Sequence, residues 1–500
     1  MGVETMLKTR EVEDIDCDVT GNVGVELTAK VKVGGGSGEV VGERLTISRR
    51  CRGGVPPIQF CLDFGRVNFN KPLGSDSFYL FGALIVWNYA LTLTSSGIRW
   101  CDSYELLTNH YQRWRLSLRT VNTAETWCQP RGQARGPWIR GLPLPLPVWA
   151  NDESPALTFP TVEQYEELAG SVELETQRLL REHRYDTVSN FLRLYEEFKV
   201  SGETSLERFY RKYQPVITNE HHTCVGLGFE LLRRLCSLNK KFPGIAGRLY
   251  LVSCEETIGD IAGYVGGPPA ADSGEKEHVL VCLKIEINDR RGVLLLDPGY
   301  HVARVVTVMA DKLYPHTGWF TQSEEPNCKK EYNYTMCATD SDYVEWHERE
   351  NRPGAQERTQ VALIYVARPY LTAIDVTERR NLVYNFRSLL ARDTKGHVTA
   401  GIYFPVVRDI NQSHSFTIFY QTSNGKKRLK MPFSKFFGSP KTTHDAEETT
   451  ILLECARQMG LTCEKFEGLL SNLATVMHDT KYIAQLLTIN ARINTLAEDN

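Results

Sequence analysis

Three residues of this 500-residue chain have types and positions that suit nucleophilic catalysis. Cys224 stands at the predicted first turn of a helix, where unpaired backbone N–H groups and the helix dipole stabilise a thiolate. His278 begins a predicted strand, and Asp297 ends the next strand along the chain. A thiol nucleophile needs a base, and the base needs a third group that fixes its tautomer. Cys224, His278 and Asp297 are therefore the candidate nucleophile, base and orienting acid of a catalytic triad.

Hydrophobic periodicity predicts the elements that must position these three residues. The apolar run that begins at Cys224 repeats at helical spacing, and Thr223 is the expected N-cap of that helix. The strands His278–Ile287 and Val293–Asp297 form a hairpin. Counted from the turn, His278 and Asp297 are offset by about three residues, so we expect a bulge or a strong twist to bring them together.

The remainder of the chain contains both helical and strand patterns. Amphipathic spacing predicts helices over 161–199 and over 445–500, with a break near Gly460. Further strands are predicted at Arg248–Ser253, Val361–Val366, Gly401–Val407, Phe416–Thr422 and Arg428–Phe433. The last two flank Asn424-Gly425, a strong hairpin signal.

These elements predict an α+β fold in several parts. A helical bundle precedes an antiparallel β-barrel-like domain and a C-terminal α/β segment, and the N-terminal extension has no assigned fold. The predicted domains are 1–155 for the extension with its Pro-rich linker at Leu142–Pro147, 156–245 for the bundle carrying the cysteine, 246–375 for the β-barrel-like domain carrying the histidine and aspartate, and 376–500 for a lid-like α/β domain.

The order of these motifs resembles that of the arylamine N-acetyltransferases, a family within the transglutaminase-like and papain-like thiol enzymes. The matching positions are Cys224 at a helix start, His278 at the head of an apolar strand, and Asp297-Pro298-Gly299-Tyr300 at the end of its partner. The segment Asn381–Leu390 and the strands after it are similar to the family's third domain, so the resemblance covers residues from about 161 to the C-terminus.

The resemblance implies an acyltransferase activity. An acetyl or other acyl group would pass from acyl-CoA, with acetyl-CoA as the expected donor, to a small-molecule amine through an acyl-enzyme on Cys224. His278 would act as the base, Asp297 would hold its imidazole, and backbone N–H groups at the helix start would stabilise the oxyanion. No metal is part of this chemistry.

The sequence departs from the family next to the nucleophile. The family usually has Arg-Gly-Gly-x there, where this chain has Glu220, His221, His222 and Thr223, and it often has glycine where this chain has His301. Two alternatives therefore stay open. One is a catalytically inactive binding scaffold with its old pocket filled by the two histidines, and the other is a thiol hydrolase or transglutaminase-like enzyme using the same triad.

Other binding chemistries find less support in the spacing of residues. Glu220, His221, His222 and Cys224 are too closely spaced for a zinc site, because adjacent side chains cannot point the same way in regular structure. The Gly-rich run Val33–Val40 lacks the Gly-Lys-Ser/Thr ending of a phosphate loop. We expect no metal site.

Composition bounds the partners and the compartment. The formal net charge is −3, so the chain as a whole has no positive field that would attract nucleic acid, and no nucleic-acid partner is expected. Thirteen scattered cysteines without a CxxC pair indicate reduced thiols and a cytoplasmic location, and the acidic N-terminus lacks a signal sequence. Ser77–Ile98 is uncharged and long enough to span a bilayer, but its Asn88 and its aromatics favour a buried element. No membrane partner is expected.

Overall fold

The chain is described here from a computed structural model, which places residues 133–266, 276–408, 414–438 and 446–496 and four short strands nearer the N-terminus. It divides into two compact units between Asn122 and Thr123. The uncharged segment Ser77–Ile98 lies outside the described residues. So does the Gly-rich run Val33–Val40, except for Val40 itself.

The first unit contains two small antiparallel pairs of strands. Strand β1 (Val25–Leu27) pairs with β4 (Leu45–Ile47), and β2 (Lys30–Val31) pairs with β3 (Val40–Val41).

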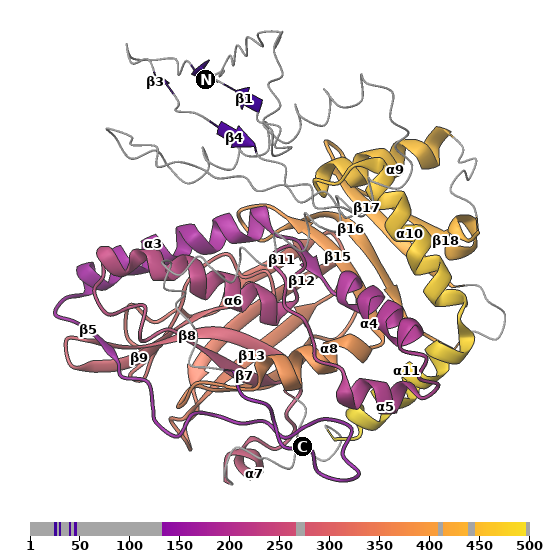
Figure 1. Cartoon of the computed structure of the whole chain (residues 1–500). Coiled ribbons are helices and arrows are strands. Elements are labelled where there is room, and N and C mark those ends of the chain that lie inside the picture. Colours follow the sequence, from indigo (N-terminus) through magenta and orange to yellow (C-terminus); the bar gives the residue numbers. More distant parts are fainter. Residues whose placement is uncertain are drawn as a thin grey trace, which may run out of the picture. The chain divides into compact units, whose positions relative to one another are not determined.

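The second unit is an α+β structure, as predicted, with helices before, between and after two sheets (Figure 1). Its α-helices are α3 (Val162–Glu182), α4 (Val188–Ser201), α5 (Leu206–Lys212), α6 (Cys224–Leu235), α7 (Ile261–Val265), α8 (Arg379–Val383), α9 (Ala446–Gln458), α10 (Cys463–His478) and α11 (Thr480–Asn494). A short π-helix, η2 (Ala373–Glu378), leads directly into α8.

The larger sheet is an antiparallel half-barrel of eight strands in the order β10-β9-β8-β7-β14-β13-β12-β11, to which β5 adds in parallel beside β8. These strands are β5 (Leu157–Phe159), β7 (Tyr250–Glu255), β8 (His278–Ile287), β9 (Arg290–Leu296), β10 (Val306–Met309), β11 (Phe320–Glu325), β12 (Cys328–Met336), β13 (Tyr343–Asn351) and β14 (Arg358–Tyr365).

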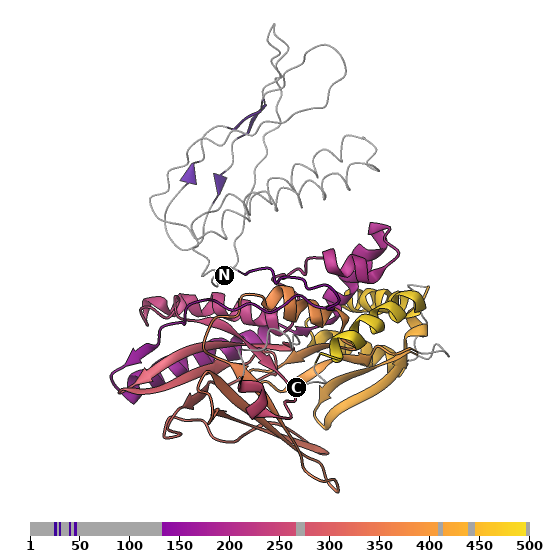
Figure 2. The ribbon, with the colours of Figure 1, turned by 90° about the horizontal axis from the view of Figure 1, so that it is seen from below.

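The smaller sheet has the order β18-β17-β16-β15-β6. Its strands are β6 (Tyr185–Asp186), β15 (Phe386–Arg392), β16 (Val398–Pro405), β17 (Ser415–Thr422) and β18 (Gly425–Pro432). The predicted hairpin between the last two is present, with Thr422 opposite Gly425. Figures 1 and 2 show the C-terminal helices (yellow) at the same end of the unit as this sheet (orange).

The strand β8 is buried on both faces, which explains its nearly continuous apolar sequence. Val281 and Leu283 share a hydrophobic core with Leu231 of α6, whereas Leu280 packs on the opposite face with Trp346 of β13. Helix α6 therefore lies directly over the strand that begins with His278, and the two candidate residues are brought to the same end of the sheet.

Strands β5, β6, β10 to β13 and β15 were not predicted from the sequence. In β11, β12 and β13, charged side chains weaken the strand signal, because Glu and Lys have low β-propensity and interrupt the apolar pattern. Tyr332 and Tyr334 nevertheless point into the core from β12, while their neighbours Glu331 and Asn333 are less buried. The predicted long helix over 161–199 is also two helices, since β6 interrupts it.

The Pro-rich segment Leu142–Pro147 belongs to the second unit. Leu144 is buried in the core around the smaller sheet, and the Leu146 N–H donates to the Pro137 carbonyl (2.9 Å). Across the described ranges, no helix combines the length and the apolar character needed to cross a bilayer.

Candidate active site

Cys224 is the first residue of α6, as predicted. Thr223 occupies the N-cap position with an extended backbone, but its side chain does not cap the helix. Instead, the Thr223 hydroxyl donates a short hydrogen bond to the buried carboxyl of Glu378. The predicted N-cap position of Thr223 is therefore confirmed, although its hydroxyl binds a distant carboxyl instead of the helix. The first backbone N–H groups of α6 are thus not capped by the Thr223 side chain.

His278 and Asp297 are in direct contact, with the imidazole Nε2 and the carboxyl Oδ1 2.9 Å apart. The register of β8 and β9, in which Val281 faces Leu296, places Asp297 two positions diagonally from His278. Diagonal neighbours on one face of a sheet are within reach of long side chains. The expected bulge is absent from this hairpin, because the real offset is smaller than the one counted from the sequence.

The thiol of Cys224 completes the cluster. It lies close enough to the His278 imidazole to raise the pKa of that ring, and because Asp297 contacts Nε2, the ring nitrogen left for the thiol is Nδ1. Gly299 lies against both groups: a Cβ at this position would be 2.6 Å from His278 Cε1 and 2.7 Å from Cys224 Cβ. All three side chains are nearly inaccessible to solvent, and Cys224 is 3% exposed.

The surroundings of His278 favour its charged form. Burial alone lowers the pKa of the imidazole, but the negative charge of Asp297 and its hydrogen bond raise it, and Cys224 raises it further, so that the net pKa lies well above 6.5. Tyr300 covers the ring edge-on, with the ring centroids 4.6 Å apart, and its backbone N–H donates to Asp297 Oδ1 (3.0 Å). The arrangement stabilises the imidazolium that forms when His278 accepts a proton.

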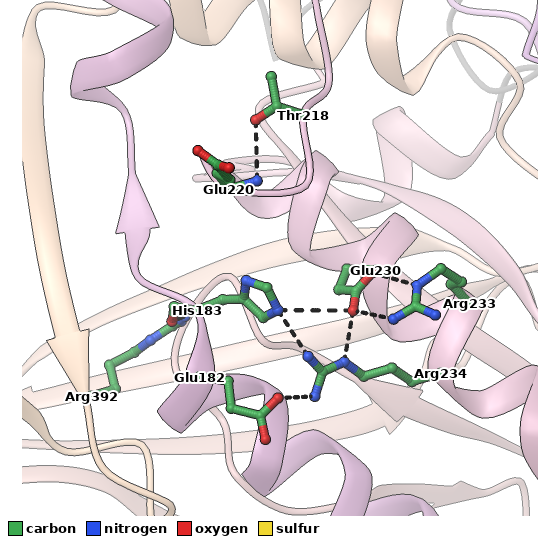
Figure 3. Close-up of polar contacts among 8 residues, drawn as sticks. All are labelled: Glu182, His183, Thr218, Glu220, Glu230, Arg233, Arg234 and Arg392. Carbon is green, nitrogen blue, oxygen red and sulfur yellow. Dashed lines mark hydrogen bonds and ion pairs between the residues drawn. The ribbon is translucent and has the colours of Figure 1, made fainter. Parts of the chain in front are cut away.

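The residues just before Cys224 that differ from the resembled family lie in different environments. Glu220 is largely exposed, and its backbone N–H donates to Thr218 Oγ1 (3.3 Å), as Figure 3 shows. His222 is buried, and burial followed by the charge of His183 lowers its pKa to about 4. His222 is therefore neutral at pH 7 and provides no positive charge to the thiol.

A charged cluster lies around His183, whose ring packs edge-on against His222 (4.8 Å between centroids). The Arg234 guanidinium donates to His183 Nε2 (2.8 Å), as Figure 3 shows. Arg234 is in turn paired with Glu230 (2.8 Å) and Glu182 (2.7 Å). In the described ranges, no group of three His, Cys, Asp or Glu side chains is arranged to hold a metal ion.

Two residues of this site were not predicted. The Asn381 side-chain amide of α8 donates to Cys224 Sγ (3.7 Å), and Glu378 binds Thr223, the residue before the thiol. Asn381 is 157 residues from Cys224 and belongs to no short motif. The only sequence signal was a polar residue opening the segment that resembles a third domain.

A pocket of about 290 Å³ opens beside the loop that carries Asp297. Its lining includes His301, Arg304, Phe320 and Lys395. His301 has a φ of 64°, in the left-handed region that glycine adopts most readily.

Comparisons with known proteins assign no relative. No protein-family model matches the chain, and no curated protein or solved structure matches it.

Proposed function

We propose that this protein is a thiol acyltransferase that moves an acyl group from acyl-CoA to an amine through an acyl-enzyme on Cys224. The observation that carries the proposal is the cluster at the start of α6, where Gly299 packs against both Cys224 and His278 and the His278 imidazole contacts Asp297. A thiol, a base and an orienting carboxyl in contact are the three parts that nucleophilic catalysis requires.

The reaction has two steps. First, the Cys224 thiol proton moves to His278, the sulfur attacks the thioester carbonyl, and the leaving CoA thiolate takes the proton from the imidazolium. Second, the amine attacks the acyl-enzyme while His278 accepts the amine proton and returns it to the departing Cys224 sulfur, so that an amide and the free thiol result. Asp297 holds the imidazole and stabilises its charged form in both steps.

One feature favours a phosphate-bearing donor such as acyl-CoA, and a second agrees with the family resemblance. The pocket beside the triad loop contains Arg304 and Lys395, whose charges suit a phosphate group. The left-handed backbone of His301 also fits the resemblance to arylamine N-acetyltransferases, because the family often has glycine at the position after the aromatic residue.

The test is intact mass after incubation with acetyl-CoA. We expect a mass increase of one acetyl group in the wild type, its absence in Cys224→Ala, and its retention in Cys328→Ala, which removes another free cysteine. Addition of an aromatic amine should discharge the adduct and form the amide. An adduct that persists in Cys224→Ala contradicts the proposal.

The same experiment separates the two alternatives. A Cys224 that reacts with iodoacetamide but gains no acetyl group, and whose alkylation CoA does not slow, would favour a thiol hydrolase or transglutaminase-like enzyme that acts on a peptide amide. A Cys224 that neither acylates nor reacts with iodoacetamide would assign a catalytically inactive binding scaffold, in keeping with its 3% exposure.

A further inference from the structure

The C-terminal part of the second unit contacts the nucleophile through two residues on one helical face. Glu378, the last residue of η2, binds the Thr223 hydroxyl, and Asn381, three positions later in α8, donates its side-chain amide to Cys224 Sγ. Residues three apart lie on the same side of a helix. This segment therefore places one polar side chain on each of two consecutive residues, Glu378 on Thr223 and Asn381 on Cys224.

The backbone at Asn381 is held in place by a buried arginine. The fully buried guanidinium of Arg387 donates to the Asn381 carbonyl (2.5 Å) and to the Leu382 carbonyl (2.5 Å). Two residues before Asn381, the Arg379 guanidinium donates to Asp375 Oδ1 (2.5 Å). A side chain on a backbone fixed in this way loses little freedom when it binds a reacting group, which is the condition for an effective catalytic donor.

The Asn381 amide can also reach an oxygen that forms next to the Cys224 sulfur during the reaction. Its Nδ2 is 3.7 Å from Sγ, and an oxyanion formed on attack is attached to the carbon bonded to that sulfur. A donor that touches the sulfur is therefore within reach of this oxygen. Asn381 is half-buried rather than enclosed, so it has room to turn toward an incoming acyl group.

We infer that Asn381 is an oxyanion-binding residue that acts with the backbone N–H of Cys224 during acyl transfer. This inference rests on the proposed function. As Sγ bonds to the acyl carbon, the carbonyl π-electron pair moves to oxygen, and the two N–H groups bind that charge. When the bond to the leaving group breaks, the electron pair returns and the two hydrogen bonds weaken. Removal of one such donor typically lowers the rate of the chemical step about 10²–10³-fold.

The experiment compares two reactions of the same thiol in the full-length chain. Acetylation by p-nitrophenyl acetate passes through an oxyanion, whereas alkylation by iodoacetamide is a direct displacement at carbon and forms none. The variants are Asn381→Leu, which keeps the volume and removes the donor, and Asn381→Ala. Tyr384→Ala is the matched control, because Tyr384 is exposed and follows Asn381 by three residues.

We expect acetylation of both Asn381 variants to slow about 10²–10³-fold while alkylation changes less than about threefold. The Tyr384→Ala control should behave as the wild type in both reactions. Unchanged acetylation, or an equal loss in both reactions, overturns the inference, since an equal loss means that Asn381 only positions or ionises the thiol. A wild type that alkylates but is never acetylated overturns the proposed function itself. Alkylation at the wild-type rate also shows that a variant is folded around Cys224.

Discussion

A carboxyl group buried away from water carries a cost that depends on pH, and Glu378 is such a group. Burial raises its pKa to about 7, although hydrogen bonds from Thr223 and Asn190 and the charge of Arg387 act in the opposite direction. Since Thr223 precedes the nucleophile, the protonation of this one residue is connected to the backbone at the start of α6.

At this scale, Glu378→Gln should change how stability depends on pH. The folded state keeps the Glu378 proton between pH 4.5 and about 7, where the unfolded chain has lost it, so the free energy of unfolding of the wild type falls as pH rises through this window. The shift corresponds to about 3 kcal/mol. Urea unfolding at pH 5 and pH 8 should show this decrease in the wild type and a decrease smaller by about that amount in Glu378→Gln.

The control for this measurement is Glu447→Gln, at an exposed position of α9. It should keep the wild-type pH dependence. If Glu378→Gln also keeps it, the carboxyl is already ionised at low pH and its assigned pKa is wrong.

At the scale of elements, the loop after β9 determines how closely the helix and the strand approach. Asp297 leaves β9, and Gly299 fills the narrow space between Cys224 on α6 and His278 on β8. No side chain larger than hydrogen fits there without movement of the groups on either side. The spacing of the triad is thus a property of this loop as much as of the elements that carry its residues.

We expect Gly299→Ala to lower the rate of Cys224 acetylation about 10²-fold, because its Cβ would be 2.6 Å from His278 and 2.7 Å from Cys224 and must displace one of them. Gly318→Ala is the matched control, since no atom lies within 4 Å of a Cβ at that position. The rate of acetylation measured by stopped-flow release of p-nitrophenol tests both. A wild-type rate in Gly299→Ala would mean that the thiol and imidazole are farther apart during reaction than in this structure.

At the scale of the whole second unit, one arginine joins segments that are far apart in the chain. Arg392 of β15 donates to the carbonyls of Pro298 (2.7 Å) and His183 (2.8 Å) and to His301 Nδ1 (3.1 Å). Figure 3 shows it next to the His183 backbone. The smaller sheet, the end of α3 and the triad loop therefore share a single buried cation, and burial lowers its pKa to about 9.

Arg392→Ala should lower the free energy of unfolding by about 3 kcal/mol, because it leaves two buried carbonyls without their donor. Arg457→Ala on the exposed side of α9 should change it by no more than about 0.5 kcal/mol. Chemical denaturation measures both. Equal effects of the two substitutions would show that water replaces the Arg392 contacts and that the three segments are held together by other interactions.

The sequence by itself determined the local elements of the site. Helical spacing after Cys224 and the apolar run after His278 predicted α6 and β8 with their first residues correct, because both patterns are local and are strengthened by burial of the same side chains. The α+β class followed from the order of such patterns. Where charged residues cover one face of a strand, as in β12 and β13, the local pattern was too weak and the strands were missed.

Only the tertiary structure decided which residues meet at Cys224. The diagonal contact of His278 with Asp297 depends on the register of the hairpin, and a shift of one residue would turn one side chain to the other face. Asn381 and Glu378 reach Cys224 and Thr223 across more than 150 residues of chain. Contacts at such separations arise from the packing of whole elements, so no local spacing in the sequence specifies them.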